Sequence, residues 1–317
     1  MKILHLCNRF TGRVWKEASV LQADGHKIVV LFREMAVRGT DSDILYMSRW
    51  DTPERLHQKL AAICPGMDAV HVHTSLTALD MPAYALNHHD RVVWDVHDWS
   101  AEVKAAVEGI GPGVTYIAPG SKLAATVGAT ARTTHTHIVA SKVPRRYHIT
   151  PSKQDARTIA LNSDIDIAPA WRNYQPVQKM FLEHGFRFDI FPATQSPRMQ
   201  AHYSRLMQSL NYLSLLQELS QYGWNYVGAA NRTVRIDNCV THKFWESLAV
   251  GVPVITWQSA EMRFLALGIS VDLAEPEALE KIADPGVRAE CAAELTHRQH
   301  EFAMECEIPK IIQAYGG

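Results

Sequence analysis

Short apolar runs alternate along the first half of the chain with longer amphipathic segments. The apolar runs have the length of strands, the amphipathic segments have the length of helices, and Gly25 closes the first of these helices. We expect strands at 2–6, 27–32, 69–73, 91–96 and 137–140, and helices at 13–24, 52–63, 76–87 and 121–132. Apolar strands separated by helices of this length predict a parallel sheet that is covered on both faces.

The same alternation starts again after a polar segment at 151–157, which has the composition of a linker. The second series predicts strands at 158–161, 187–191, 224–228 and 252–257, helices at 175–184, 200–218 and 241–250, and a largely helical tail at 285–315. We therefore expect an α/β protein with two Rossmann-like domains, 1–152 and 153–300, and a tail, 301–317, that packs back on the first domain. A ligand site is expected in a cleft between the two, at the carboxyl ends of the strands.

Composition and charge exclude several classes of protein. The 317 residues are 47% hydrophobic, which excludes extended disorder, and a net charge of -1 excludes a generally polybasic protein. The five cysteines are scattered, lack a CxxC pair and are odd in number, which favours free thiols in a cytoplasmic protein. The first residues lack the features of a signal peptide, and no apolar run reaches the length of about 18 to 20 residues that a membrane span needs.

The stretch 237–256 carries the most informative chemistry. A polar loop containing Asn238 leads into a helix that opens at Thr241, followed by Gly251-Val-Pro and a buried strand. Lys243 and Glu246 are three residues apart and therefore share one face near the start of this helix. A helix amino terminus with a lysine can bind phosphate, and a carboxylate one turn later can accept both hydroxyls of a ribose. An exposed Lys–Glu pair on an amphipathic helix is the alternative interpretation.

This stretch resembles the donor-binding segment of GT-B glycosyltransferases of the GT4-like group, with its pattern K-x-x-E-x-x-A-x-G-x-P-V-I. The resemblance implies that Glu246 holds the ribose of a nucleotide sugar and that Lys243 contacts the diphosphate. The family's earlier glutamate is replaced here by Asn238. In this respect the loop is also similar to that of phage enzymes that glucosylate hydroxymethylcytosine in DNA. Further similar segments are the opening strand and helix, DAVHVH at 68–73, VVWDVHD at 92–98 and the closing helix from 302.

Three side chains follow the expected strand at 91–96. Asp95, His97 and Asp98 lie where an open α/β sheet presents catalytic groups, and a carboxylate or an imidazole can deprotonate an acceptor hydroxyl. We prefer Asp98 as the base of an inverting reaction, with His97 as the second candidate. Alternatively, Asp95 or Asp98 caps the helix that begins near Ser100.

Two other segments supply candidate binding residues. Arg172 follows the first strand of the second domain, where a basic residue of the resembling enzymes clamps the donor diphosphate; a surface arginine is the alternative. Asn8, Arg9 and Gly12 form the loop after the first strand, and we expect this loop to face the acceptor or the cleft, together with His73. A simple strand-to-helix turn would have the same sequence.

No metal or other cofactor is expected. His71 and His73 alternate on one strand, and the spacing along the chain offers no third ligand, so we interpret them as core or cleft histidines. The DxD pairs at 41–43 and 164–166 are too short to indicate a manganese site. A metal-independent reaction, in which Lys243 and Arg172 offset the leaving-group charge, follows from the resemblance.

The segment 132–157 is rich in arginine, lysine and histidine and contains a single acidic residue, Asp155. It could contact a nucleic-acid backbone, an anionic lipid surface or only solvent. We therefore predict a hexosyltransferase that uses a UDP-glucose-like donor, with a hydroxymethylated base in phage DNA as the candidate acceptor. A transferase acting on a glycan, lipid or small molecule and a non-catalytic nucleotide-sugar-binding protein are the alternatives.

Overall fold

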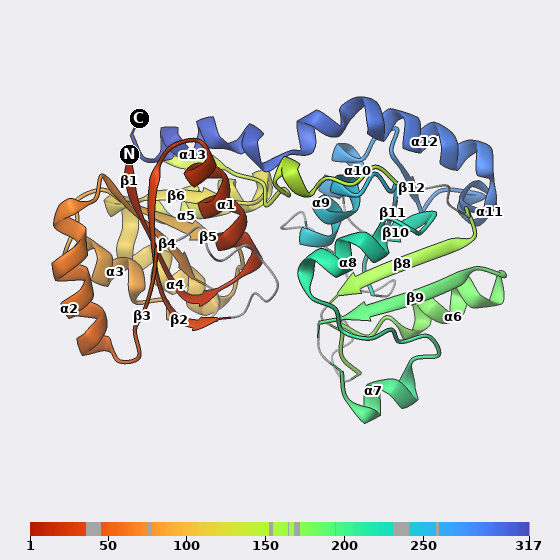
Figure 1. Cartoon of the computed structure of the whole chain (residues 1–317), viewed down its shortest axis with the longest axis horizontal. Helices are drawn as coiled ribbons and strands as arrows, with labels where there is room; N and C mark the ends of the chain where they lie inside the picture. Colours follow the sequence, from red (N-terminus) through yellow and green to blue (C-terminus); the bar gives the residue numbers. More distant parts are fainter. Residues whose placement is uncertain are drawn as a thin grey trace. The chain divides into compact units, whose positions relative to one another are not determined.

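The computed structural model describes residues 1–35, 46–74, 78–151, 155–163, 165–167, 172–193, 195–230, 241–257 and 260–316. The chain forms two compact units. Unit 1 contains Met1–Pro144 and Met304–Gly317, and unit 2 contains Arg145–Ala303. Figure 1 shows a sheet with flanking helices in each unit.

Unit 1 is built on a parallel sheet of seven strands in the order β3-β2-β1-β4-β5-β6-β7. Its strands are β1 (Lys2–Phe10), β2 (Lys27–Met35), β3 (Tyr46–Arg49), β4 (Ala69–Thr74), β5 (Val92–Val96), β6 (Thr115–Ala118) and β7 (Thr136–Ile138). Its helices are α1 (Gly12–Ala23), α2 (Pro53–Ile63), α3 (Met81–Leu86), α4 (Ala101–Ile110), α5 (Ser121–Ala131) and α13 (Ile308–Ala314). The central strands β4 and β5 are buried along their whole length, as expected for a sheet covered on both faces.

Unit 2 repeats this plan with a parallel sheet of five strands in the order β12-β11-β10-β8-β9. Its strands are β8 (Thr158–Ser163), β9 (Arg187–Pro192), β10 (Trp224–Tyr226), β11 (Val254–Thr256) and β12 (Ser270–Asp272). Its helices are α6 (Gln175–Glu183), α7 (Pro197–His202), α8 (Tyr212–Leu219), α9 (His242–Ala249), α10 (Ala260–Leu265), α11 (Ala278–Ala283) and α12 (Pro285–Arg298). The two parallel sheets confirm the predicted α/β class with two Rossmann-like halves.

Several elements differ from the prediction. The short strands β3, β6 and β12 were not expected, and the helix expected at 200–218 is two helices, α7 and α8. Between these helices the backbone is held by β9, because the Ile190 amide donates to the Arg205 carbonyl (3.0 Å) and the Met207 amide donates to the Ile190 carbonyl (2.8 Å). These bonds to a strand interrupt what the apolar pattern alone reads as one helix.

The division between the units lies at 144/145 rather than at 152/153. Residues 145–151 belong to unit 2, where the Ile149 amide donates to the Ala249 carbonyl (2.9 Å). The return to unit 1 begins at Met304, whose amide donates to the Val143 carbonyl (3.0 Å), rather than at 301. The tail is fixed by a buried ion pair between Glu307 and Lys142, with their charged atoms 2.6 Å apart.

The Gly-x-Pro motif at 251–253 ends helix α9. Gly251 has a φ of +68°, a backbone conformation that favours glycine, and its amide donates to the Leu248 carbonyl (3.1 Å). A Cβ atom at this position would lie 2.5 Å from Cδ of Pro151. The glycine therefore allows both the sharp end of the helix and the close approach of the neighbouring chain.

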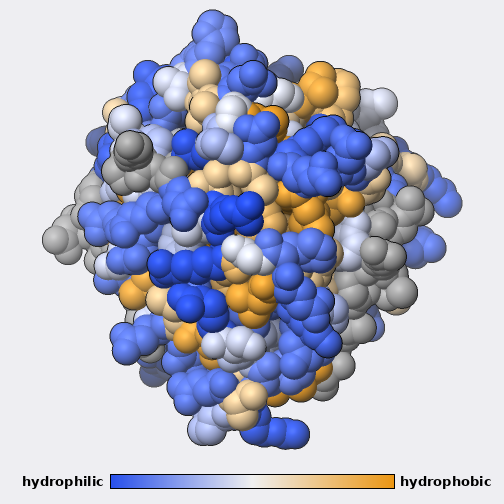
Figure 2. All heavy atoms as spheres, turned by 90° about the vertical axis from the view of Figure 1, so that its right-hand side faces the viewer, coloured by the Kyte–Doolittle hydropathy of each residue, from blue (hydrophilic) through white to orange (hydrophobic). Residues whose placement is uncertain are grey.

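In the face that Figure 2 shows, hydrophilic residues cover most of the area, and hydrophobic ones lie between them.

Within the part of the chain that the structure describes, no helix combines the length and the apolar character needed to cross a bilayer. The cysteines described there, Cys7, Cys64, Cys291 and Cys306, form no disulfide.

The strand orders define where each unit can bind a ligand. In unit 1 the order reverses between β1 and β4, and in unit 2 it reverses between β8 and β10. Open α/β sheets bind ligands beyond the carboxyl ends of their strands at such reversals. The side chains near these two strand ends are therefore the ones to consider for function.

Candidate functional site

Lys243 and Glu246 lie on helix α9 of unit 2, and both are buried, with 7% of each residue exposed. Nζ of Lys243 donates to the Tyr174 hydroxyl (2.8 Å) and lies 4.7 Å from the centre of the Tyr174 ring. Burial of Tyr174 opposes its ionisation, but the charge of Lys243 and its hydrogen bond outweigh this effect and lower the pKa of the phenol. The alternative of an exposed Lys–Glu pair is therefore wrong.

Glu246 is positioned by side chains from two other elements. Nδ2 of Asn162, near the end of β8, donates to Oε2 of Glu246 (2.6 Å). Burial of the Tyr212 hydroxyl and its contact with the Glu246 carboxylate raise the pKa of Tyr212 well above its usual range. These contacts fix the carboxylate beside the carboxyl end of β8, next to the reversal of strand order in unit 2.

Arg172 lies in the segment that leads from β8 to α6, two residues before Tyr174. Its carbonyl oxygen accepts a hydrogen bond from the Asp166 amide (3.1 Å), and its side chain is half-buried. Lys179, on the following helix α6, lies 3.7 Å from Glu183 on the surface. The segment that follows β8 therefore carries both Arg172 and Tyr174, the partner of Lys243.

Thr241 immediately precedes α9, and its hydroxyl contacts the sulfur of Met262 (3.8 Å) rather than capping the helix. Asn238 lies outside the described residues. Together, Lys243, Glu246 and the first turn of α9 offer a cation, an oriented carboxylate and helix amides. This set can hold a phosphate next to a sugar diol.

Asp95 is the centre of a buried network in unit 1. Nε and Nη2 of Arg13 donate to its two carboxylate oxygens at 2.5 and 3.0 Å, and Nδ1 of His73 lies 3.2 Å from Oδ2. Burial alone favours the neutral acid, but the charge of Arg13 and the neighbouring His97 hold the pKa of Asp95 well below its usual range. A carboxylate occupied in this way orients its neighbours and is a poor proton acceptor.

His97 and Asp98 follow Asp95 at the end of β5. Nδ1 of His97 lies 3.2 Å from Oδ1 of Asp95, and the imidazole is only 20% exposed. Asp98 is exposed. Helix α4 is capped by Ser100, whose hydroxyl accepts a hydrogen bond from the Val103 amide (3.2 Å), so neither aspartate caps it.

The loop predicted after the first strand is shorter than expected. Asn8 and Arg9 are part of β1, which pairs with β2 as far as Phe10, and α1 begins at Gly12. Arg9 faces Glu34 on the neighbouring strand (3.6 Å), and both side chains are more than half exposed. Asn8 is buried near the carboxyl end of β1. The predicted connection thus contracts to a single residue between strand and helix.

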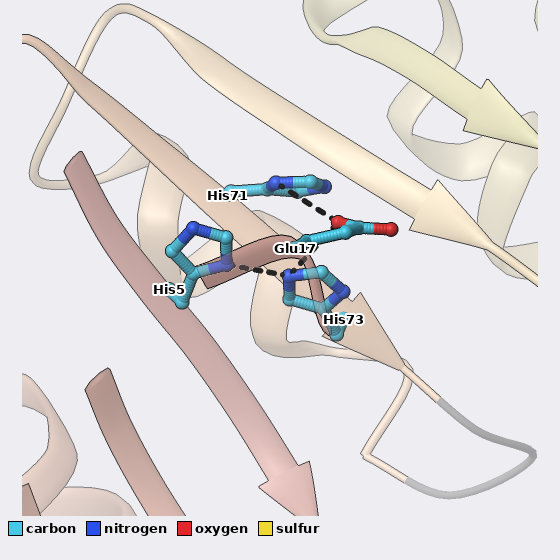
Figure 3. A group of neighbouring side chains, drawn as sticks. All are labelled: His5, Glu17, His71 and His73. Atoms are coloured by element: carbon cyan, nitrogen blue, oxygen red, sulfur yellow. Dashed lines mark hydrogen bonds and ion pairs between the residues drawn. The ribbon is translucent and has the colours of Figure 1, made fainter. Parts of the chain in front are cut away.

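His71 and His73 are buried, as expected for core histidines, but the fold places further possible metal ligands beside them that the spacing along the chain does not show. His5 from β1, Glu17 from α1 and both histidines of β4 place one ligand atom each within 4.8 Å of one another, and all four residues are buried (Figure 3). His73 also contributes to a second group with Asp95 and His97. His73 is 3% exposed, and it contacts Asp95 and stacks against the ring of His97 (centroids 6.3 Å apart).

The basic segment 132–157 is not a continuous charged surface. Lys142 is neutralised by Glu307, and Arg157 stacks on the ring of Phe186 (5.6 Å). Arg132 and His135 lie on unit 1 and line a shallow hollow of about 520 Å³, whereas Arg145 and Arg146 belong to unit 2. Lys153 lies outside the described residues.

The sequence analysis overlooked the groups that position these side chains, namely Asn162, Tyr174 and Tyr212 in unit 2 and Arg13 in unit 1. Arg13 and Asp95 are 82 residues apart, and Asn162 and Glu246 are 84 residues apart. A signal existed for Asn162, because it is a polar residue at the end of the first strand after the restart, where parallel sheets bind ligands.

The fold has clear counterparts among solved structures. An α-glucosyltransferase in complex with UDP and DNA containing an HMU base matches with a TM-score of 0.74, 11% identity and full coverage of both chains. WaaG, a glycosyltransferase involved in lipopolysaccharide biosynthesis, matches with a TM-score of 0.66 and 12% identity over 98% of this chain and 99% of its own. AviGT4, a glycosyltransferase involved in avilamycin A biosynthesis, matches with a TM-score of 0.63 and 11% identity over 99% and 96%.

Comparisons of the sequence, unlike those of the structure, find no match. No family model and no curated protein matches the chain. The similarity therefore resides in the fold, which agrees with the resemblance seen in the motifs and confirms the predicted fold class. The chain has the fold of the GT-B glycosyltransferases.

Proposed function

We propose that this protein is a glycosyltransferase that moves a hexose from a nucleotide sugar, with UDP-glucose as the first candidate donor, to an acceptor hydroxyl. The observation that carries the proposal is the buried Lys243–Glu246 pair on α9, held by Tyr174 and Asn162 at the ligand-binding edge of the unit 2 sheet. A similar fold in a solved structure binds UDP. In this proposal Glu246 accepts the ribose hydroxyls, and Lys243 with Arg172 neutralises the diphosphate.

The donor roles need no divalent metal. Two side-chain cations and the amides of a helix start can offset the negative charge that develops on a leaving diphosphate. Thr241 and Asn238 adjoin this helix start in the sequence and are assigned to the same donor site. We assign no metal to the transfer step.

On the acceptor side we propose that His97 removes the proton of the attacking hydroxyl. Nδ1 of His97 lies 3.2 Å from Oδ1 of Asp95, so the carboxylate faces this side of the ring, and Nε2 is the nitrogen proposed for proton transfer. Asp98, exposed and next to it, is the competing base.

We propose a hydroxymethylated base in DNA as the acceptor, and a cytoplasmic location for the enzyme. Support comes from the solved α-glucosyltransferase with HMU-containing DNA and from the donor loop that resembles phage enzymes. A glycan, lipid or small-molecule acceptor is the second candidate, because WaaG and AviGT4 have the same fold.

The test begins with binding and proceeds to transfer. UDP-, GDP- and ADP-glucose are compared for thermal stabilisation, and radiolabelled donor is then offered with hydroxymethylated DNA, unmodified DNA and a lipid-linked glycan, with and without EDTA. We expect stabilisation by the UDP sugar and EDTA-resistant label in hydroxymethylated DNA only. If label appears only in the glycan, the proposal of a DNA acceptor is wrong. If the donor binds but is neither transferred nor hydrolysed, the protein is a non-catalytic nucleotide-sugar-binding protein.

A matched pair of variants tests the donor site. Glu246→Ala removes the oriented carboxylate, whereas Glu183→Ala removes the carboxylate of the exposed Lys179–Glu183 pair one turn apart on α6. Only Glu246→Ala should weaken nucleotide-sugar binding in calorimetry. Equal affinities for both variants would show that α9 does not bind the donor.

A further inference from the structure

We propose that His5, His71, His73 and Glu17 form a metal site inside unit 1 that binds one divalent transition-metal ion of the zinc type. The four side chains come from β1, α1 and β4 and converge on one point, as Figure 3 shows. All are buried, with at most 3% of any residue exposed. This site is separate from the donor site in unit 2 and does not depend on the proposed transfer reaction.

The spacing of the ligand atoms suits a small ion. Nδ1 of His5 lies 2.9 Å from Nε2 of His73, and Oε2 of Glu17 lies 3.8 Å from Nδ1 of His71 and 4.0 Å from Nε2 of His73. Zinc bound at about 2.0–2.1 Å to four ligands separates neighbouring ligand atoms by roughly 3.3 Å. Side-chain shifts on the order of 1 Å therefore convert the cluster to tetrahedral coordination.

The hydrogen-bonding pattern leaves polar atoms that a cation would satisfy. Both carboxylate oxygens of Glu17, which supply the oxygen ligand of the proposed site, are buried and have no hydrogen-bond partner within the described part of the chain. Arg13 lies 3.2 Å from Oε1 of Glu17 but without hydrogen-bond geometry. A buried acceptor without a donor costs about 1–3 kcal/mol, and an ion bound to the Glu17 carboxylate removes part of that cost.

The surroundings resemble the outer shell of a metal site. Nδ1 of His73 lies 3.2 Å from Asp95, which fixes the tautomer that points Nε2 at the cluster, as carboxylates do for metal-bound histidines. Nδ1 of His71 lies 2.8 Å from the Tyr315 hydroxyl, so the closing helix supplies a group that satisfies this nitrogen when no ion is bound. Burial lowers the pKa of all three imidazoles, which keeps them in the neutral form that binds metals.

The ligand set points to a metal of borderline softness. Three imidazoles and one carboxylate suit zinc, and cobalt, nickel and copper compete for the same donors, whereas magnesium and calcium prefer all-oxygen sites. The full burial of the cluster leaves the ion no open face for a substrate, so the site is structural. It would tie β1, β4 and α1 together beneath the strand ends of unit 1.

The wild-type full-length chain provides the first test. We expect about one zinc per chain by elemental analysis, a lower melting temperature after chelation and its recovery on adding zinc. Cobalt added to the chelated protein should give the visible bands of tetrahedral coordination without a thiolate charge-transfer band. X-ray absorption should show nitrogen and oxygen ligands. Metal content near zero together with no response to zinc, or sulfur ligands such as Cys7, would overturn the proposal.

Two variants and one control assign the ligands. His5→Gln and His71→Gln should each lower zinc affinity at least tenfold and abolish the cobalt bands. His57→Gln is the control, because Nδ1 of His57 lies 3.1 Å from Nε2 of His88 in unit 1 without belonging to a metal-type cluster among the described residues. Unchanged zinc binding in folded His5→Gln and His71→Gln contradicts the site. If neither variant folds, the spectra of the wild-type protein decide.

Discussion

Asn162 and Glu246 lie 84 residues apart in the sequence, and the Asn162 amide donates a 2.6 Å hydrogen bond to Oε2 of Glu246. The contact joins the end of β8 to α9, so strand and helix together fix the direction of one carboxylate. Both groups are buried, with 9% and 7% of the residues exposed. A carboxylate that is oriented before the ligand arrives loses little entropy when it accepts two hydroxyls.

Loss of this contact should weaken donor binding without removing the carboxylate. We expect Asn162→Ala to raise the Kd for UDP-glucose about tenfold and Glu246→Ala to raise it about a hundredfold. In a double-mutant cycle followed by calorimetry, the two effects should be less than additive, because Asn162 acts through Glu246. Fully additive effects would mean that Asn162 contacts the donor by itself.

Substitution of Lys243 should weaken the binding of ligands that carry a diphosphate and leave the binding of uridine nearly unchanged. We expect Lys243→Ala to weaken UDP binding by about ten- to a hundredfold while uridine binding changes little, because the ammonium pairs with the diphosphate. Tyr174→Phe keeps the ammonium and the ring, so its effect should be smaller. Lys179→Ala, which removes an exposed lysine from α6, is the control for net charge. An equal loss of UDP and uridine affinity would place Lys243 away from the phosphates.

The effects of variants at His97 and Asp98 on kcat show which of the two residues is the base. If His97 is the base, His97→Ala should lower kcat by about 10²- to 10⁴-fold, whereas Asp98→Asn should keep most of the activity. Neither change should alter the Kd for UDP-glucose much, since the donor contacts proposed above come from Lys243, Glu246 and Arg172 of unit 2. If Asp98→Asn lowers kcat more than His97→Ala does, Asp98 is the base that removes the proton.

Gly251 is required by the backbone. Gly251→Ala forces a side chain into a conformation with φ of +68° and places Cβ 2.5 Å from Pro151, so we expect a loss of about 2–4 kcal/mol in the free energy of unfolding. Gly109→Ala is the control, because this glycine lies in α4 and a Cβ atom added to it would meet no heavy atom within 4 Å. Urea unfolding should show Gly109→Ala to be stabilised by about 0.4–1 kcal/mol. Equal stability of the two variants would contradict this reading of the motif.

The sequence predicts most strands of the two sheets but misses the short strands β3, β6 and β12, of which β6 lies inside its sheet. Alternating apolar runs identified most of the strands, since buried parallel strands read as continuous apolar segments. β3 and β12 are edge strands of four and three residues and carry too few apolar positions for such a pattern. The helix expected at 200–218 is interrupted by hydrogen bonds to β9, a tertiary effect that periodicity does not contain.

The site residues also differ in how well the sequence predicts them. Lys243 and Glu246 are neighbours on one helix, so their spacing places them on one face, and the resemblance to a donor-binding segment singled them out as candidates. Asn162 comes from another strand, and the His5–His71 pairing depends on β1 and β4 being adjacent in the sheet, where these residues face each other across the ladder. Strand order and register decide such contacts, and neither can be read from the spacing of residues along the chain.

Glu307 should make the stability of the protein sensitive to acid. Burial opposes its ionisation, but Lys142 at 2.6 Å and Lys310 at 2.9 Å outweigh burial and lower the pKa of Glu307 below 4.5. As the pH falls below about 4.5, the unfolded chain binds this proton before the folded one does, so the contribution of Glu307 is present above that pH and lost below it.

Glu307→Gln tests this contribution directly. It removes the carboxylate that lies 2.6 Å from the buried ammonium of Lys142, and we expect a loss of about 3–5 kcal/mol at pH 7 and a smaller difference from wild type at pH 4 and below. Glu108→Gln breaks an exposed Lys104–Glu108 pair and should cost less than about 1 kcal/mol at either pH. Urea unfolding at pH 7 and pH 4 separates the two variants. A difference between Glu307→Gln and wild type that does not shrink with acid would show that Glu307 is not charged in the folded protein.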